Sequence, residues 1–131
     1  MPASNYVQCK TLDGWLCGQD VTFPPVGYLA LYTTNPTAAD SGTEVTGGGY
    51  VRMPAQFTQA ASQGEHSVTQ NANKVEFPEA TEPWGRVAYF GIRDAETGGN
   101  LLYFSPLTTS FDVVSGTAPK FEAGAITVTL E

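Results

Sequence analysis

Short stretches of alternating apolar and polar residues, separated by turns rich in glycine and proline, run along most of this chain. Alternation with a period of two is typical of β-strands, whose successive side chains point to opposite faces of a sheet. The pattern predicts strands at residues 27–33, 50–57, 66–70, 73–77, 86–93, 101–107, 111–114, 120–122 and 125–130. The polar segments 35–49 and 59–65 are expected to be surface loops.

Three of these stretches predict where a strand lies in its sheet. The segment 27–33 is apolar on both faces, so it is expected in the middle of a sheet. Pro54 has no N–H to donate, which places the strand 50–57 at an edge or a bulge. In the last strand, alternation turns Ile126, Val128 and Leu130 toward the core.

The clearest supersecondary element is a predicted β-hairpin in the last third of the chain. Its arms are residues 86–93 and 101–107, and residues 94–100 form a turn that contains a Gly-Gly pair. About eight short strands in a chain of this length predict an all-β fold, a two-sheet β-sandwich of jelly-roll-like type. Residues 1–131 are expected to form a single domain.

The first twenty residues follow a different period and predict one short helix. Apolar side chains recur there at spacings of three and four, Ser4 is a suitable N-cap, and Gly18 can end the helix. A helix this short is marginal alone in water, so its apolar residues are expected to dock on the chain's own sheet or on another subunit. These docking residues are Tyr6, Leu12, Trp15 and Leu16. Because Pro24-Pro25 forms an extended hinge, residues 1–26 are expected to act as a docking arm.

Two cysteines, Cys9 and Cys17, lie on the predicted helix. A helix would separate their Cα atoms by roughly 12 Å, whereas a disulfide spans at most about 7 Å. An internal disulfide is therefore excluded. Two alternatives stay open. The two cysteines are either free, partly buried thiols or form an intermolecular disulfide with a neighbouring copy.

Charge and composition narrow the function classes. The formal net charge is −7, and the six Lys and Arg residues are scattered, which argues against nucleic acid as a partner. No segment has the roughly 18 apolar residues of a membrane span, so no membrane association is expected. Because the N-terminus does not resemble a signal peptide, the protein is expected to be made in the cytoplasm of the cell that produces it.

The residues that could carry catalysis do not form a recognisable set. His66 is the only histidine, so no transition-metal set is predicted, and no serine stands in a nucleophile elbow. The acidic pairs of the turns resemble glycosidase carboxylates, but acids in turns usually cap backbone amides. A calcium site in the hairpin turn would lack the usual ligand spacing. The acidic and amide residues of these loops and turns are Glu79, Glu82, Asp94, Glu96 and Asn100. We therefore predict that the protein is not an enzyme and binds no cofactor and no metal.

Aromatic side chains offer an alternative function, because exposed rings can stack on sugars. Most of the aromatic residues alternate within the predicted strands, where core packing is expected. Trp84 follows a proline-containing loop and is the best candidate for an exposed ring. The alternative prediction is a carbohydrate-binding module that engages host-surface glycans.

Several runs of the sequence resemble a known family. These runs are SNYVQCKTLDGWLCG at the start, GTEVTGGGYVR and DAETGGNLL in the turns, and FEAGAITVTLE at the end. Together they resemble the small bacteriophage virion proteins commonly labelled phage tail fibre proteins. The resemblance implies a non-enzymatic structural component of the virion, made in the host cytoplasm. It also implies other virion proteins as partners, a homo-oligomer that is a trimer by analogy, and a place in a tail fibre or in a capsid decoration (cement) layer.

Overall fold

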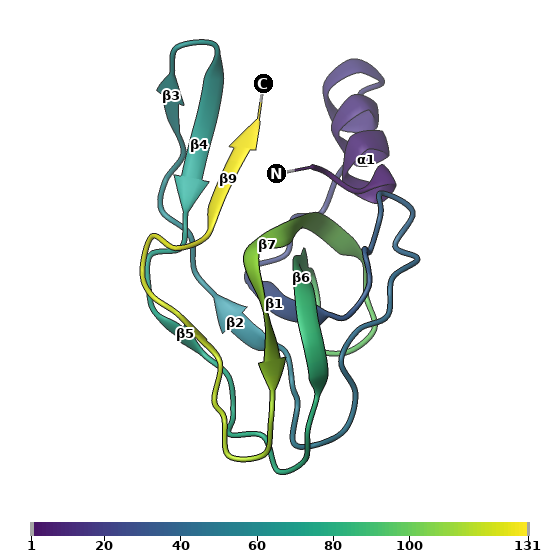
Figure 1. Cartoon of the computed structure of the whole chain (residues 1–131). Helices are drawn as coiled ribbons and strands as arrows, with labels where there is room; N and C mark the ends of the chain where they lie inside the picture. The colour runs from purple at the N-terminus through teal and green to yellow at the C-terminus, as the bar shows by residue number, and fades with distance from the viewer. Residues whose placement is uncertain (1, 131) are drawn as a thin grey trace.

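The computed structural model describes residues 2–130, which form one N-terminal helix and a series of short β-strands (Figure 1). Among these residues, no helix has the length and the apolar character needed to cross a membrane. The elements are α1 (Asn5–Leu16), β1 (Gly27–Tyr32), β2 (Met53–Ala55), β3 (Ala61–Gln63), β4 (His66–Gln70), β5 (Val75–Glu76), β6 (Gly85–Arg93), β7 (Leu101–Val113), β8 (Lys120–Phe121) and β9 (Thr127–Leu130).

The strands form a β-sandwich-like arrangement and not a closed barrel. One sheet has four strands in the order β2-β1-β6-β7, a second has three in the order β3-β4-β9, and β5 and β8 form a two-stranded ribbon. Neighbouring strands pair antiparallel throughout. The predicted all-β, sandwich-like fold with one N-terminal helix is confirmed. In Figure 1, α1 and the β3-β4-β9 sheet lie at the same end of the molecule.

β1 lies between β2 and β6 and is buried on both faces, as its two-sided apolar pattern predicts. Leu29 and Leu31 belong to the main core, which fills the space between the sheets. Ala30 and Tyr32 face the other way and belong to a smaller cluster with Leu101. The central strand therefore joins two separate apolar clusters.

The β6–β7 hairpin is confirmed, but its second arm differs from the prediction. Segments 101–107 and 111–114, predicted as two strands, form the single long strand β7. Val87 pairs with Phe111, whereas Tyr89 pairs with Pro106, so a bulge in β7 lies opposite Ala88. The irregularity places Val87 in the main core and Tyr89 beside the smaller cluster, although strict alternation predicts one face for both.

Other strand predictions need correction. The segment 59–65, predicted to be a loop, contains the edge strand β3. All residues of β3 are exposed, so the sequence has no alternation of apolar and polar residues there that would predict a strand. The strand predicted at 50–57 is reduced to Met53–Ala55, and Pro54 lies on an edge strand as expected. In the last strand Val128 is buried as predicted, but Leu130 is 52% exposed because the four-stranded sheet does not cover that end.

Candidate docking surface

α1 is held to the rest of the molecule mainly through its N-terminal end. The Ser4 hydroxyl accepts a hydrogen bond from the Val7 N–H at 3.2 Å, which confirms the predicted N-cap, and donates to the Leu101 carbonyl. The Ser4 N–H donates to the Leu102 carbonyl at 2.8 Å. The helix ends before Gly18, whose φ of +69° favours glycine. No residue of the helix itself is buried.

The exposed face of α1 carries large apolar side chains. Leu12 and Leu16 are four residues apart and therefore lie on one face, where they are 57% and 77% exposed. Trp15, three residues after Leu12, lies beside this face and is 83% exposed. We call Leu12, Trp15 and Leu16 the apolar stripe. The structure brings together these three predicted docking residues and leaves each of them more than half exposed.

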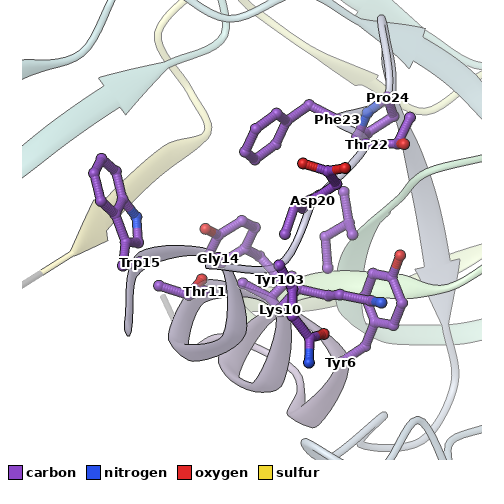
Figure 2. A pocket seen from close by; sticks show the side chains of 14 residues that line it. Tyr6, Lys10, Thr11, Gly14, Trp15, Asp20, Thr22, Phe23, Pro24 and Tyr103 are labelled. Atoms are coloured by element: carbon purple, nitrogen blue, oxygen red, sulfur yellow. The ribbon is translucent and has the colours of Figure 1, made fainter. Parts of the chain in front are cut away.

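The segment 17–24 returns along α1 and encloses a cavity of about 400 Å³ between the helix and β7 (Figure 2). Gly14 permits this close approach, because a Cβ at this position would lie 3.0 Å from a methyl group of Val21. In Figure 2, Trp15 and Tyr6 stand at opposite ends of the cavity. Tyr6, the fourth predicted docking residue, thus lines this cavity and does not belong to the apolar stripe.

A second cavity, of about 270 Å³, lies between the open end of the four-stranded sheet and the inner face of β4 and β9. Its lining includes Phe57, Ile92, Val128 and Leu130. Both cavities are also lined by Pro24, Leu102 and Tyr103, so they adjoin one another. Apolar surface is therefore continuous from α1 to β9.

Sequence reasoning missed part of this surface. Phe23 precedes the Pro24-Pro25 hinge and is not among the predicted docking residues, but its ring is 80% exposed beside the first cavity. No local pattern marks it as exposed, because the residue before a proline is only biased toward an extended backbone. Cys9 and Cys17 are free and exposed, which corrects the expectation of partly buried thiols. Their exposure follows from the outward orientation of the helix.

A network of two arginines stabilises the long loop after β1 against the β6–β7 turn. Arg52 contacts both carboxylate oxygens of Glu44, at 2.7 and 2.8 Å, and donates to the carbonyls of Ala95 and Gly98. The hydrogen bond to Glu44 raises the pKa of Arg52. The loop and the turn, far apart in the sequence, are thus cross-linked by one side chain.

Arg93 makes the second half of this network from a buried position. Its guanidinium contacts both carboxylate oxygens of Asp40, at 2.8 and 2.9 Å, and donates to the Tyr32 hydroxyl at 2.8 Å. Burial opposes the charged form, but the hydrogen bonds to Asp40 and Tyr32 outweigh it and raise the pKa of Arg93. The sequence contained a signal for this site, because alternation puts Arg93 on the sheet face that carries Tyr89 and Gly91. An arginine buried on such a face needs a paired acid.

Stability is expected to fall as the pH rises above about 10, in part because of Tyr50. Burial and a 2.6 Å hydrogen bond to Glu44 raise the pKa of Tyr50 above its ordinary value of 10.0. Above that pH the unfolded chain releases the phenolic proton while the folded chain retains it, so unfolding is favoured. Denaturant unfolding at several values between about pH 9 and pH 11 measures how steeply the free energy of unfolding falls with pH. Tyr50→Phe should flatten this slope, and an unchanged slope would contradict the assignment.

The other candidate residues take structural positions. Asp94 accepts hydrogen bonds from the backbone N–H of Asn100 at 2.7 Å and from its side-chain amide at 3.1 Å, as expected of a turn acid. Trp84 is buried and donates its indole N–H to the Gly48 carbonyl at 2.9 Å, so the prediction of an exposed ring is wrong. His66 begins β4 and is half-buried. Residues 2–130 contain no group of three or more His, Cys, Asp or Glu side chains that could hold a metal ion.

The fold and this surface define a small β-sandwich-like protein with a concentration of exposed apolar side chains at one end, which is typical of proteins that assemble with others. A family model described as Podophage GP4 fiber I protein gp80 matches residues 2–129, and the chain belongs to this family. It is therefore a structural protein of a phage virion that associates with other virion components, and the resemblance to phage tail fibre proteins is confirmed. No curated protein matches the chain.

Proposed function

We propose that this chain is a non-enzymatic tail-fibre subunit that docks on another virion protein through the apolar stripe, with residues 1–26 as its docking arm. The observation that carries this proposal is the exposure of Trp15 and Leu16, which are 83% and 77% exposed on a helix anchored at its other end. Burying such side chains stabilises a complex by about 25 cal/mol per Å² of apolar surface.

Charge supports a different protein as the partner of the stripe. Each copy carries a formal charge of −7, which opposes close association of two copies and favours a neutral or basic partner surface. Homo-oligomerisation through other surfaces, as a trimer, stays a prediction that light scattering on purified protein tests. An intermolecular disulfide through Cys9 or Cys17 likewise stays a prediction, tested by non-reducing electrophoresis of purified particles.

The double variant Trp15→Ser/Leu16→Ser is expected to reduce the number of copies per particle at least tenfold, because it removes two of the three residues of the stripe. Copies are counted by quantitative mass spectrometry of particles assembled in cells that produce only the variant. The purified variant should keep the stability of the original protein, since both side chains are exposed.

Val114→Ser is the matched control, because Val114 is also an exposed apolar residue but lies outside α1. This control should be incorporated normally. Normal incorporation of the Trp15→Ser/Leu16→Ser variant would refute docking through the stripe.

Carbohydrate binding is the second candidate, favoured by two exposed rings, Trp15 and Phe23, beside a cavity that also presents Lys10 and Asp20. Aromatic rings stack on sugar rings, while charged groups bond sugar hydroxyls. A glycan array probed with purified protein separates the candidates. Binding that is lost in Trp15→Ala would favour this function, whereas no glycan binding together with failed virion incorporation favours docking.

A further inference from the structure

We propose that the outer edge of β9 accepts an extended segment of another virion protein, which adds to the β3-β4-β9 sheet as a fourth strand. This inference rests on the family's association with other virion components. It does not require docking through α1, because it concerns the backbone of β9 and a different kind of contact.

The backbone of β9 leaves hydrogen-bonding groups available. The Ile126 carbonyl accepts a hydrogen bond from the Asn71 N–H at 3.0 Å, so the backbone groups of Ile126 point toward the side of β4. In antiparallel strands these directions alternate from one residue to the next. Those of Thr127 and Thr129 therefore point to the opposite side, where no strand among residues 2–130 pairs with β9. Two N–H and two carbonyl groups are left for a partner.

The other edges of the two larger sheets are protected against strand addition. β2 contains Pro54, and β3 is a short run of exposed small and polar residues, 61–63. β7 contains Pro106 and is already paired near its start by residues 2–4. Proline, short polar strands and covering segments are the usual means of blocking an edge. Residues 127–130, with the sequence TVTL, have neither proline nor charge.

An apolar trough lies beside this edge. Its floor is the continuous surface of the two adjoining cavities, with Pro24, Leu102 and Tyr103 common to both. Val128 and Leu130 of β9 line one wall, and Leu130 is 52% exposed. A strand paired with β9 would place alternate side chains over this surface. The occupant is therefore an extended segment with apolar residues at every second position.

The shape of the trough favours a lone segment from a different protein. β9 lines the cavity on one side of the trough and α1 lines the cavity on the other, and in Figure 1 these two elements stand apart at the same end of the molecule. A second folded copy that offered its own β9 would bring β4 and β3 with it, so three strands would need a place where a lone segment needs the width of one. The charge of −7 on each copy also opposes this pairing. A flexible arm of another virion protein meets neither obstacle.

Thr129→Pro tests the proposal, because proline removes the outward N–H without removing a hydrogen bond to β4. We expect at least a tenfold loss of copies per assembled particle, whereas the control Thr129→Ser should be incorporated normally. Leu130→Asp places a charge in the trough at an exposed position and should show the same loss with an unchanged fold by circular dichroism. Normal incorporation of both Thr129→Pro and Leu130→Asp would overturn the proposal.

A cross-linking experiment identifies the occupant. The photoreactive substitution Leu130→p-benzoylphenylalanine, irradiated in assembled particles, is expected to cross-link to one extended segment of another virion protein. The Thr127 and Thr129 amides should also exchange hydrogen more slowly in particles than in purified protein. Cross-links to a second copy, or no cross-link and no protection, would overturn the proposal. Failure of the Trp15→Ser/Leu16→Ser test alone would leave these outcomes unaffected, so the two proposals fail separately.

Discussion

Replacing Arg93 by alanine is expected to lower the free energy of unfolding by about 2–3 kcal/mol, because it removes a buried guanidinium that donates several hydrogen bonds, although the Asp40 side chain is partly exposed. Arg93 is buried and contacts the Asp40 carboxylate, the Tyr32 hydroxyl and the carbonyls of Gly98 and Gly99. Alanine would leave the Asp40 charge without its counterion and the other acceptors without a donor. Denaturant unfolding at neutral pH measures the loss.

Two other arginine variants show whether the effect depends on the buried geometry. Arg86 forms an exposed pair with Asp112 at 3.6 Å, so Arg86→Ala should change the free energy of unfolding by less than about 1 kcal/mol. Arg93→Lys should rescue little, because an ammonium group cannot reproduce the bidentate contact with Asp40. A loss below about 1 kcal/mol for Arg93→Ala would mean that the loop closes without this arginine.

Phe77→Ala is expected to cost about 3–5 kcal/mol of stability, because it leaves a cavity in the centre of the main core. Phe77 is only 1% exposed. Its ring stacks on Tyr50 with centroids 6.1 Å apart and meets Trp84 and Phe121 edge-on at 6.5 and 6.3 Å. Removing the ring therefore also disrupts several aromatic contacts, each worth about 0.5–1.5 kcal/mol beyond the area buried.

The matched control is Phe23→Ala, the same substitution at an exposed position beside the α1 cavity. It should change the free energy of unfolding by no more than about 0.5 kcal/mol. Equal losses for Phe77→Ala and Phe23→Ala would contradict the division between core and surface described above. The same control variant reports separately on docking, because Phe23 adjoins the apolar stripe.

Local patterns in the sequence predicted the elements whose structure depends on near neighbours. The Ser4 cap, the central position of β1 and the β6–β7 hairpin follow from spacing, alternation and turn residues. The bulge opposite Ala88 could not be predicted, because it depends on how β7 packs across both sheets. β3 was missed for a related reason, since pairing with β4 supplies an order that its polar side chains do not encode.

The candidate site was only half visible in the sequence. The docking residues were found because the helical period brings Leu12, Trp15 and Leu16 together. The trough was not, because its walls come from segments about a hundred residues apart. The partners of Arg93 and Arg52 lie in a polar loop, where single-sequence reasoning has no means to tell a pairing acid from a solvated one.

The anchoring of α1 by Ser4 also orders events during folding. The carbonyl that the Ser4 hydroxyl contacts belongs to Leu101, 97 residues later in the chain. During synthesis the helix emerges early, but the Leu101 carbonyl that anchors Ser4 does not exist until most of the chain has been made. Contacts of such large sequence separation form slowly, since a long loop must close first. The apolar stripe thus reaches its final orientation only in a nearly finished molecule, which delays its presentation to a partner until the rest of the fold is in place.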